Sequence, residues 1–258
     1  MKFQQVARFE QTSDPPLDYL KHHHCEDVAK DEKGQTAWLN LLGKHVGPLG
    51  GVSVLDVGCG SGALLEACSK LGARPVGVDS SLSIHATRDS LSAMRGGIPF
   101  VRGDGCELPF VKGSFDVVVS IGVLEHVSRP RALVEEMARV LKPGGTLLLY
   151  FGPNRRLRFA QSASHRRTVL SYWTPQEAEQ TMRSQGVTFI RKVWAEVIQS
   201  RFERGAFTFG VLGLYSSLVR LSVRSAQRLR LENAICLACR ALERVSLQRN
   251  VGLIGTKC

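Results

Sequence analysis

The stretch VLDVGCGSG, residues 54–62, constrains the fold of this chain more than any other part of the sequence. An apolar run typical of a buried strand contains an acid, Asp56, and then leads into glycines at every second position, Gly58, Gly60 and Gly62. Glycine lets a ligand approach the backbone closely, and the amides at the start of a following helix point towards such a ligand. The stretch therefore predicts a strand, a ligand-binding turn and a helix.

Strand-like and helix-like segments alternate on both sides of this turn. Near-continuous apolar strands joined by helices are typical of a parallel sheet that is covered on both faces. We therefore expect an α/β fold with a doubly wound, mostly parallel, Rossmann-like sheet. The predicted strands are 52–58, 74–80, 98–104, 115–123 and 146–152; the predicted helices are 26–46, 61–72, 81–97 and 129–141; a turn is predicted at 142–145.

The spacing of the glycine turn separates it from the common dinucleotide-binding turn. Its pattern is Asp56-x-Gly58-x-Gly60-x-Gly62 instead of Gly-x-Gly-x-x-Gly. An acid in front of the first glycine would repel a pyrophosphate, whereas it would suit a cationic group on the ligand. The turn alone is weak evidence, because enzymes that use nicotinamide cofactors carry similar ones.

Two further acids follow the next predicted strands. Asp79 comes 23 residues after Asp56, at a distance where an acidic side chain can accept both hydroxyls of a ribose. Asp104 closes the strand after that and could accept a hydrogen bond from an adenine amino group. In doubly wound sheets ligands bind beyond the carboxyl ends of the strands. The three acids therefore predict a row of ligand-binding side chains at that edge of the sheet.

Five segments in this order resemble the successive motifs of the class I S-adenosylmethionine-dependent methyltransferases. They are VLDVGCGSG, VGVDSS, GDGCELPF, FDVVVSIGVLEHV and ARVLKPGGTLLL, and the resemblance covers roughly Val52 to Val193. It implies that S-adenosyl-L-methionine is the cofactor, whose positive sulfonium would explain the acid at Asp56. It also implies roles for the following residues: Asp56, Gly58, Cys59 and Gly60 at the methionine part, Asp79 and Ser80 at the ribose, Asp104 and Gly105 at the adenine, and Ile121 through its backbone.

Within this family the chain is most similar to the quinone-pathway O-methyltransferases, on the strength of VLEHVSRP and of the segment before TPQEAEQTMRSQGV. Those enzymes carry a Glu-x-x-Glu-His arrangement that is thought to bind a divalent metal. Here the first carboxylate is replaced by Gly122, which leaves Glu125 and His126. Hard cations take several oxygen ligands, so no metal site is predicted. His126 is the candidate catalytic residue, as a general base, and a purely structural role for it remains an alternative.

Positive charge is concentrated in the last part of the chain. Residues 151–258 carry 18 Lys and Arg against 6 Asp and Glu, a net charge of +12. The rest of the chain has a net charge of −1, so the whole chain has +11. We divide the chain into an N-terminal helical segment (1–50), a methyltransferase domain (51–200) and a basic helical C-terminal extension (201–258). In the extension, leucines that share one helical face adjoin a band of arginines: Leu214, Leu218 and Leu221 beside Arg220, Arg224 and Arg228.

Two interpretations of this extension stay open. An apolar stripe flanked by arginines suits peripheral contact with an anionic membrane, and it equally suits a helix that packs on the domain. The seven cysteines do not imply a disulfide framework, and the first residues lack the apolar core of a secretory signal. The apolar stretch Phe207–Val219 is too short to cross a bilayer as a helix. We therefore expect a cytoplasmic protein, with peripheral membrane attachment as the variant.

The sequence thus predicts a methyltransferase that acts on a small-molecule acceptor of lipophilic character, with O-methylation favoured. Methylation of RNA is an alternative suggested by the basic extension, but no basic groove with interleaved aromatic residues is present, so nucleic acid is not an expected partner. A non-catalytic cofactor-binding accessory protein docked on a membrane is another. The acceptor itself leaves no fingerprint in the sequence.

Overall fold

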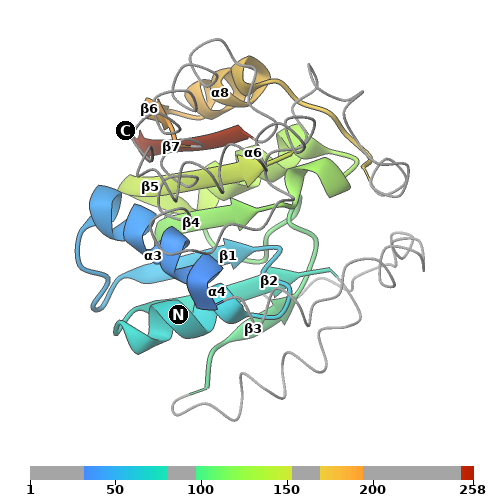
Figure 1. The fold of residues 1–258 in the computed structure, drawn as a ribbon. Coiled ribbons are helices and arrows are strands. Elements are labelled where there is room, and N and C mark those ends of the chain that lie inside the picture. Colours follow the sequence, from blue (N-terminus) through green and yellow to red (C-terminus); the bar gives the residue numbers. More distant parts are fainter. Residues whose placement is uncertain (1–31, 81–96, 153–168, 194–250) are drawn as a thin grey trace, which may run out of the picture.

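A seven-stranded sheet organises the computed structural model, which describes residues 32–80, 97–152, 169–193 and 251–258 (Figure 1). The strand order is β3-β2-β1-β4-β5-β7-β6. The first five strands of this order run parallel, and β7 runs antiparallel to both of its neighbours. The strands are β1 (Ser53–Val57), β2 (Arg74–Asp79), β3 (Phe100–Arg102), β4 (Phe115–Ile121), β5 (Leu141–Phe151), β6 (Val187–Lys192) and β7 (Val251–Lys257).

Helices cover both faces of this sheet, as predicted. On one face α3 (Glu32–Val46) and α4 (Ala63–Lys70) pack on a core that includes Trp38, Leu42 and Tyr150. On the other face α6 (Pro130–Val140) and α8 (Pro175–Ser184) pack on a larger core. The doubly wound, Rossmann-like α/β fold is thereby confirmed for the described residues.

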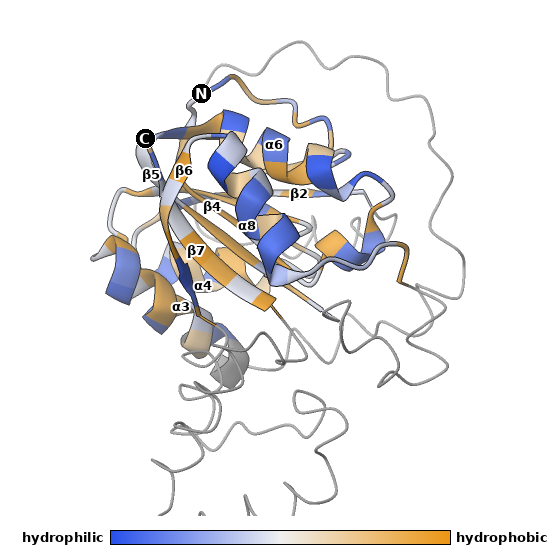
Figure 2. Cartoon of the chain, turned by 90° about the horizontal axis from the view of Figure 1, so that it is seen from above, coloured by the Kyte–Doolittle hydropathy of each residue, from blue (hydrophilic) through white to orange (hydrophobic). Residues whose placement is uncertain are grey.

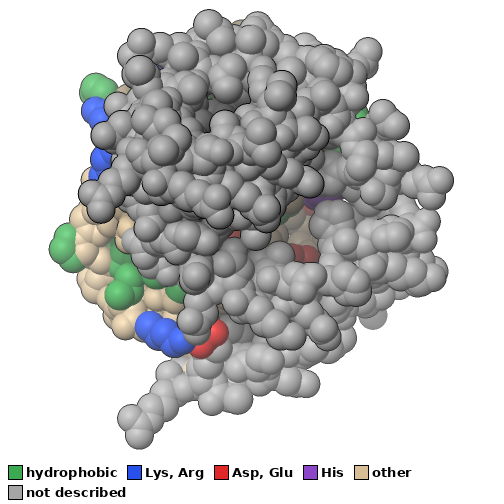
Figure 3. All heavy atoms as spheres, viewed as in Figure 1, with side chains coloured by type: hydrophobic (Ala, Val, Ile, Leu, Met, Phe, Trp, Pro, Cys, Tyr) green, Lys and Arg blue, Asp and Glu red, His purple; other side chains and the backbone are tan. Residues whose placement is uncertain are grey.

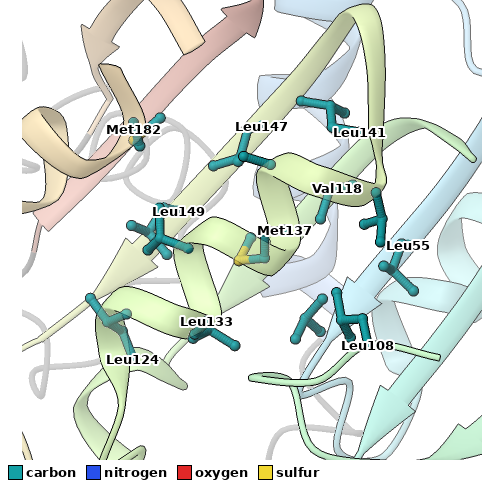
Figure 4. Packing of buried hydrophobic residues seen from close by; sticks show 14 of the residues in the cluster. Leu55, Leu108, Val118, Leu124, Leu133, Met137, Leu141, Leu147, Leu149 and Met182 are labelled. Carbon is teal, nitrogen blue, oxygen red and sulfur yellow. The ribbon is translucent and has the colours of Figure 1, made fainter. Parts of the chain in front are cut away.

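The larger core is made mainly of apolar side chains from the sheet, from α6 and from α8 (Figure 4). Met137 on α6 lies over the sheet residues Val118 and Leu147, and all three are fully buried. In Figure 2 the strands are mostly hydrophobic, while α8 carries hydrophilic residues along its exposed side. Burial of this apolar area is the main force that holds the helices against the sheet.

The start of α8 shows how the sequence sets an element boundary. Thr174 is the N-cap, its hydroxyl accepts a hydrogen bond from the Glu177 amide, and the Glu177 carboxylate accepts one from the Thr174 amide at 2.7 Å. This capping box, with Pro175 in the first helical position, satisfies amides that would otherwise lack partners. The helix therefore begins where the sequence supplies the cap.

Two predictions about the sheet were wrong. Residues 251–257 belong to β7, whose first five residues are buried between β5 and β6, so the end of the predicted helical extension 201–258 is a strand of the sheet. Residues 142–145, predicted as a separate turn, form an irregular section inside β5, where the register with β4 shifts. Gly144 has a φ of +76° there, a conformation that glycine adopts without strain.

Several predicted segments lie outside the described residues. They are the part of 1–50 before Glu32, the predicted helix within 81–96 and the leucine and arginine pattern of 214–228. Membrane attachment and cytoplasmic location therefore stay predictions. Among the helices that the structure describes, none combines the length and the apolar character needed to cross a bilayer.

Candidate functional site

The glycine turn lies at the carboxyl edge of the sheet, between β1 and α4. β1 pairs with β2 on one side and with β4 on the other, so the order of the strands reverses at this point. A crevice forms at such a reversal and is the usual ligand position in doubly wound sheets. Gly58, Gly60 and Gly62 all have positive φ angles, of +78°, +50° and +77°. The sequence pattern therefore reflects a backbone that other residues adopt only with strain.

The glycines of this turn differ in what surrounds them. A Cβ on Gly58 would collide with the side chain of Val123, so this position is a glycine because the loop after β4 packs on it. A Cβ on Gly60 would meet no atom within 4 Å. Gly60 therefore faces open space, and a ligand can approach its backbone.

The amides of the turn are used within the protein. Gly58 and Cys59 both donate to the Val78 carbonyl, at 2.7 and 3.2 Å, and Gly60 donates to Oδ2 of Asp79 at 2.8 Å. These hydrogen bonds hold the turn against the end of β2. Because the three amides already donate within the protein, the turn offers a ligand mainly an open backbone surface for close contact. The half-buried Asp79 carboxylate holds the turn in place, and Ser80 beside it is exposed.

Asp56, at the carboxyl end of β1 before this turn, is a buried residue that is 4% exposed. Burial is the main reason that the pKa of Asp56 rises to about 7, and the nearby negative charge of Asp79 adds to the rise. Within the described part of the chain, no donor forms a hydrogen bond or an ion pair with the Asp56 carboxyl. The site therefore holds two neighbouring acids, and no described residue supplies a cation to Asp56.

The Cys59 thiol points away from the open side of the turn. It packs with Leu65 and Ile98 in a small apolar cluster and lies against Gly77. Burial, together with Asp56 and Asp79, raises the pKa of this thiol well above its usual value. Cys59 is therefore an inert packing residue that can reach a ligand only through its backbone.

Asp104 lies two residues beyond β3 and is tied into a local network. Its Oδ1 accepts from the Cys106 amide at 2.8 Å, and its Oδ2 accepts from Arg129 at 3.1 Å. Arg129 also contacts Glu107 at 2.9 Å. Sequence reasoning missed Arg129, because nothing in the local pattern links it to an acid 25 positions earlier. A Cβ on Gly105 would collide with Leu133 and Val57, so the lack of a side chain there serves packing.

The loop after β4 forms the other side of the crevice. Ile121 ends β4 and is half-buried, while Gly122 has a φ of +72° and open space around its missing Cβ. A carboxylate-bearing residue at position 122 would strain this backbone. His126 is half-buried at the end of a short 3-10 helix, η1 (Leu124–His126).

Glu125, on the same turn, is more deeply buried than its neighbour His126. Its Oε1 accepts from the Gly152 amide at 3.3 Å, whereas its Oε2 is buried and has no hydrogen-bond partner among the described residues. Burial raises the pKa of Glu125 to about 8, although the hydrogen bonds from backbone amides act in the opposite direction. Its main-chain carbonyl accepts from the Leu170 and Ser171 amides, which joins η1 to the segment before α8. Sequence reasoning considered Glu125 only as a metal ligand and missed this burial.

The structure thus brings Asp56, Gly60 and Asp79 together at the end of the sheet, with Ile121 and Gly122 across the reversal point. In Figure 3 acidic side chains and a histidine are visible where the grey atoms do not cover this face. Among the described residues, no three His, Cys, Asp or Glu side chains are grouped as a metal would require. The acid pair and the open space over Gly60 fit a cofactor that carries a positive charge and approaches the backbone closely.

Comparison with known proteins agrees with this geometry. Residues 55–149 match the family described as "Methyltransferase domain". A ubiquinone biosynthesis O-methyltransferase of Agrobacterium fabrum is 27% identical over 72% of this chain and 76% of its own length. A demethylmenaquinone methyltransferase of Renibacterium salmoninarum is 37% identical over 50% of this chain and 57% of its own length. The chain spans between 40% and 62% of the length of the other curated relatives compared.

A solved structure extends the comparison to most of the chain. Geranyl diphosphate C-methyltransferase of Streptomyces coelicolor superposes with a TM-score of 0.57 over 90% of this chain and 82% of its own, at 18% identity. That likeness concerns the fold. The matched domain contains the glycine turn and the three acids. Residues 55–149 therefore form a methyltransferase domain, which agrees with the predicted use of S-adenosylmethionine.

Proposed function

We propose that this protein transfers the methyl group of S-adenosylmethionine to an oxygen atom of a small, lipophilic acceptor. The observation that carries the proposal is the open glycine turn at Gly60, flanked by the acids Asp56 and Asp79 at the point where the strand order reverses. The class of acceptor is suggested by the two relatives, whose names place them in the biosynthesis of ubiquinone and menaquinone.

In this proposal each acid has a separate task towards the cofactor, which supplies an electrophilic methyl group on a positive sulfur. Asp79 accepts the ribose hydroxyls while its Oδ2 keeps the turn in place. Asp104, held by Arg129 and the Cys106 amide, accepts from the adenine amino group. Asp56 supplies negative charge below the methionine part.

The contribution of the protein to the rate would come mainly from positioning. Holding an acceptor oxygen in line with the reacting carbon can lower a barrier by several kcal/mol without any covalent step on the enzyme. A base is needed only if the acceptor arrives protonated. The half-buried His126 would then take the proton, because a neutral imidazole can accept one near pH 7.

The test is methyl transfer from labelled S-adenosylmethionine into separate pools of lipids, water-soluble metabolites and RNA. The purified full chain is expected to label the lipid pool, in a product from which ether cleavage by hydrogen iodide releases the methyl group. Label in RNA would support the alternative of an RNA methyltransferase, and label in none of the pools would support the accessory-protein alternative. Protein heated beyond its unfolding transition serves as the control.

We further expect methyl transfer to survive treatment with EDTA. The quinone-pathway enzymes carry a carboxylate where this chain has Gly122, whose φ of +72° disfavours any residue that bears a side chain. With Glu125 buried, too few oxygen ligands remain among the described residues for a hard cation. Activity that disappears with EDTA and returns with magnesium would contradict this prediction and would restore Glu125 and His126 as ligands.

A further inference from the structure

We propose that Asp56 carries a proton in the free protein and loses it to solvent when S-adenosylmethionine binds, so that cofactor binding releases a proton near neutral pH. The inference rests on the proposed function, since it requires the cofactor to bind beside the glycine turn. It adds a property of this site that the binding of the cofactor does not by itself imply.

The surroundings of Asp56 make the charged form costly. The residue is 4% exposed, and the described part of the chain gives its carboxyl no donor. Three titratable groups interact electrostatically with Asp56. The charge of Asp79, at the end of β2, raises the pKa of Asp56, and the charge of Asp56 raises the pKa of Cys59 in the turn and of Cys68 on α4. None of these three groups can carry a positive charge. The residue that pairs with Asp56 on the neighbouring strand β4 is the apolar Val119.

A second aspartate of the sheet shows what a balanced acid looks like in the same fold. Asp116 lies at the opposite edge, where Lys142 contacts Oδ1 at 2.7 Å and the Ser53 amide contacts Oδ2 at 2.9 Å. Burial alone would raise the pKa of Asp116, but these hydrogen bonds outweigh it and lower the pKa to about 2. Lys142 thus supplies a cation to Asp116, whereas no described residue supplies one to Asp56, where the cation would come with the ligand.

The direction of the coupling follows from the charges. Burial and Asp79 raise the pKa of Asp56 to about 7, so below that pH the free protein holds the proton. A positive charge on the ligand favours the carboxylate and lowers its pKa, so binding at low pH must first remove the proton. The affinity should rise about tenfold per pH unit below this pKa and level off above it.

The positive charge could come from either of two groups on the methionine part of the cofactor, the sulfonium or the ammonium. S-adenosylhomocysteine keeps the ammonium and lacks the sulfonium charge, and methylthioadenosine lacks both. Measurements between pH 5.5 and 7.5 keep an α-amino group, whose usual pKa is about 8, mostly protonated. The three compounds therefore separate the two sources.

The experiment is isothermal titration calorimetry of the full chain in two buffers with different enthalpies of ionisation. At pH 6 we expect about one proton to be released per S-adenosylmethionine bound, and at least a tenfold gain in affinity between pH 5.5 and 7.5. Asp56→Asn mimics the protonated form and should bind with an affinity that does not change with pH. Glu66→Gln removes an exposed acid of α4 that pairs with Lys70, and it should behave like the wild type.

The outcomes separate this inference from the proposed function. Release with S-adenosylmethionine alone, or with S-adenosylhomocysteine as well, supports the inference and identifies the sulfonium or the ammonium as the source. Tight binding of S-adenosylmethionine without proton release overturns the inference and leaves the methyltransferase function intact. Equal proton release with methylthioadenosine, which lacks both positive groups, has the same consequence. No binding of any adenosyl compound would overturn the proposed function itself. If Asp56→Asn fails to fold, the proton count of the wild type still decides.

Discussion

Replacing Gly60 by valine is expected to reduce the affinity for S-adenosylmethionine by roughly 100-fold or more, which corresponds to about 3 kcal/mol. The reason is steric, because a Cβ at this position would project into the open space that faces the backbone of the turn. The branched side chain would occupy the volume that the cofactor needs. Calorimetry on the folded variant measures the loss.

A matched variant separates this steric effect from backbone strain. Gly113 lies before β4, has a φ of +70° and also meets nothing within 4 Å of its missing Cβ. Gly113→Val should therefore lose a similar amount of stability, on the order of 1–2 kcal/mol, without losing cofactor affinity. Equal affinity in the two variants would mean that the cofactor does not approach Gly60.

Asp79→Ala should weaken the binding of S-adenosylmethionine by about 2–4 kcal/mol, as expected for the loss of charge-assisted hydrogen bonds. Two contributions add here. The variant loses the acceptor for the ribose hydroxyls, and it frees the Gly60 amide, which Oδ2 of Asp79 holds at 2.8 Å in the native protein. The titrations should be run at pH 8 or above, because Asp79 also raises the pKa of Asp56.

Asp79→Asn distinguishes these two contributions. Its amide oxygen can still accept from Gly60, but its amino group cannot accept a ribose hydroxyl. An affinity between those of the wild type and Asp79→Ala is therefore expected. If folded Asp79→Ala binds the cofactor as tightly as the wild type, the assignment of Asp79 to the ribose is wrong.

The strands around the site could be predicted because each is a short, continuous apolar run. β1, β2 and β4 are buried on both faces, as expected for parallel strands under two layers of helices. The placement of Asp56 and Asp79 at adjacent strand ends follows from that topology. The fold class and the methyltransferase domain were therefore accessible from the sequence alone. The sheet topology confirms the fold class, and the family match over residues 55–149 confirms the domain.

The contacts between those residues could not be predicted in the same way. The hydrogen bond from Gly60 to Asp79, and the ion pair between Arg129 and Asp104, join residues 19 and 25 positions apart. Neither leaves a local pattern. The burial of the Glu125 carboxyl was missed because the local sequence does not distinguish a buried glutamate from an exposed one. The carboxyl is placed by a hydrogen bond from the amide of Gly152, just after β5 and 27 residues further along the chain.

β7 escaped prediction for a related reason. The run Val251–Lys257 is brief and contains Gly252 and Gly255, residues that usually weaken a strand. In the sheet Gly255 is required, because a Cβ there would press on Val187 and on the Thr188 carbonyl. Only the neighbouring strands, far away in the sequence, reveal why glycine suits this position.

The position of β7 also sets the order in which the sheet can assemble. β5 ends at Phe151 and β6 at Lys192, yet β7, which joins them, begins only at Val251. Until synthesis has passed Lys257, β6 has no hydrogen-bonding neighbour and β5 exposes an open edge to other chains. Such long-range pairing is slow because a large loop must close first. The edge of β5 is therefore covered only after the last strand of the sheet has been synthesised.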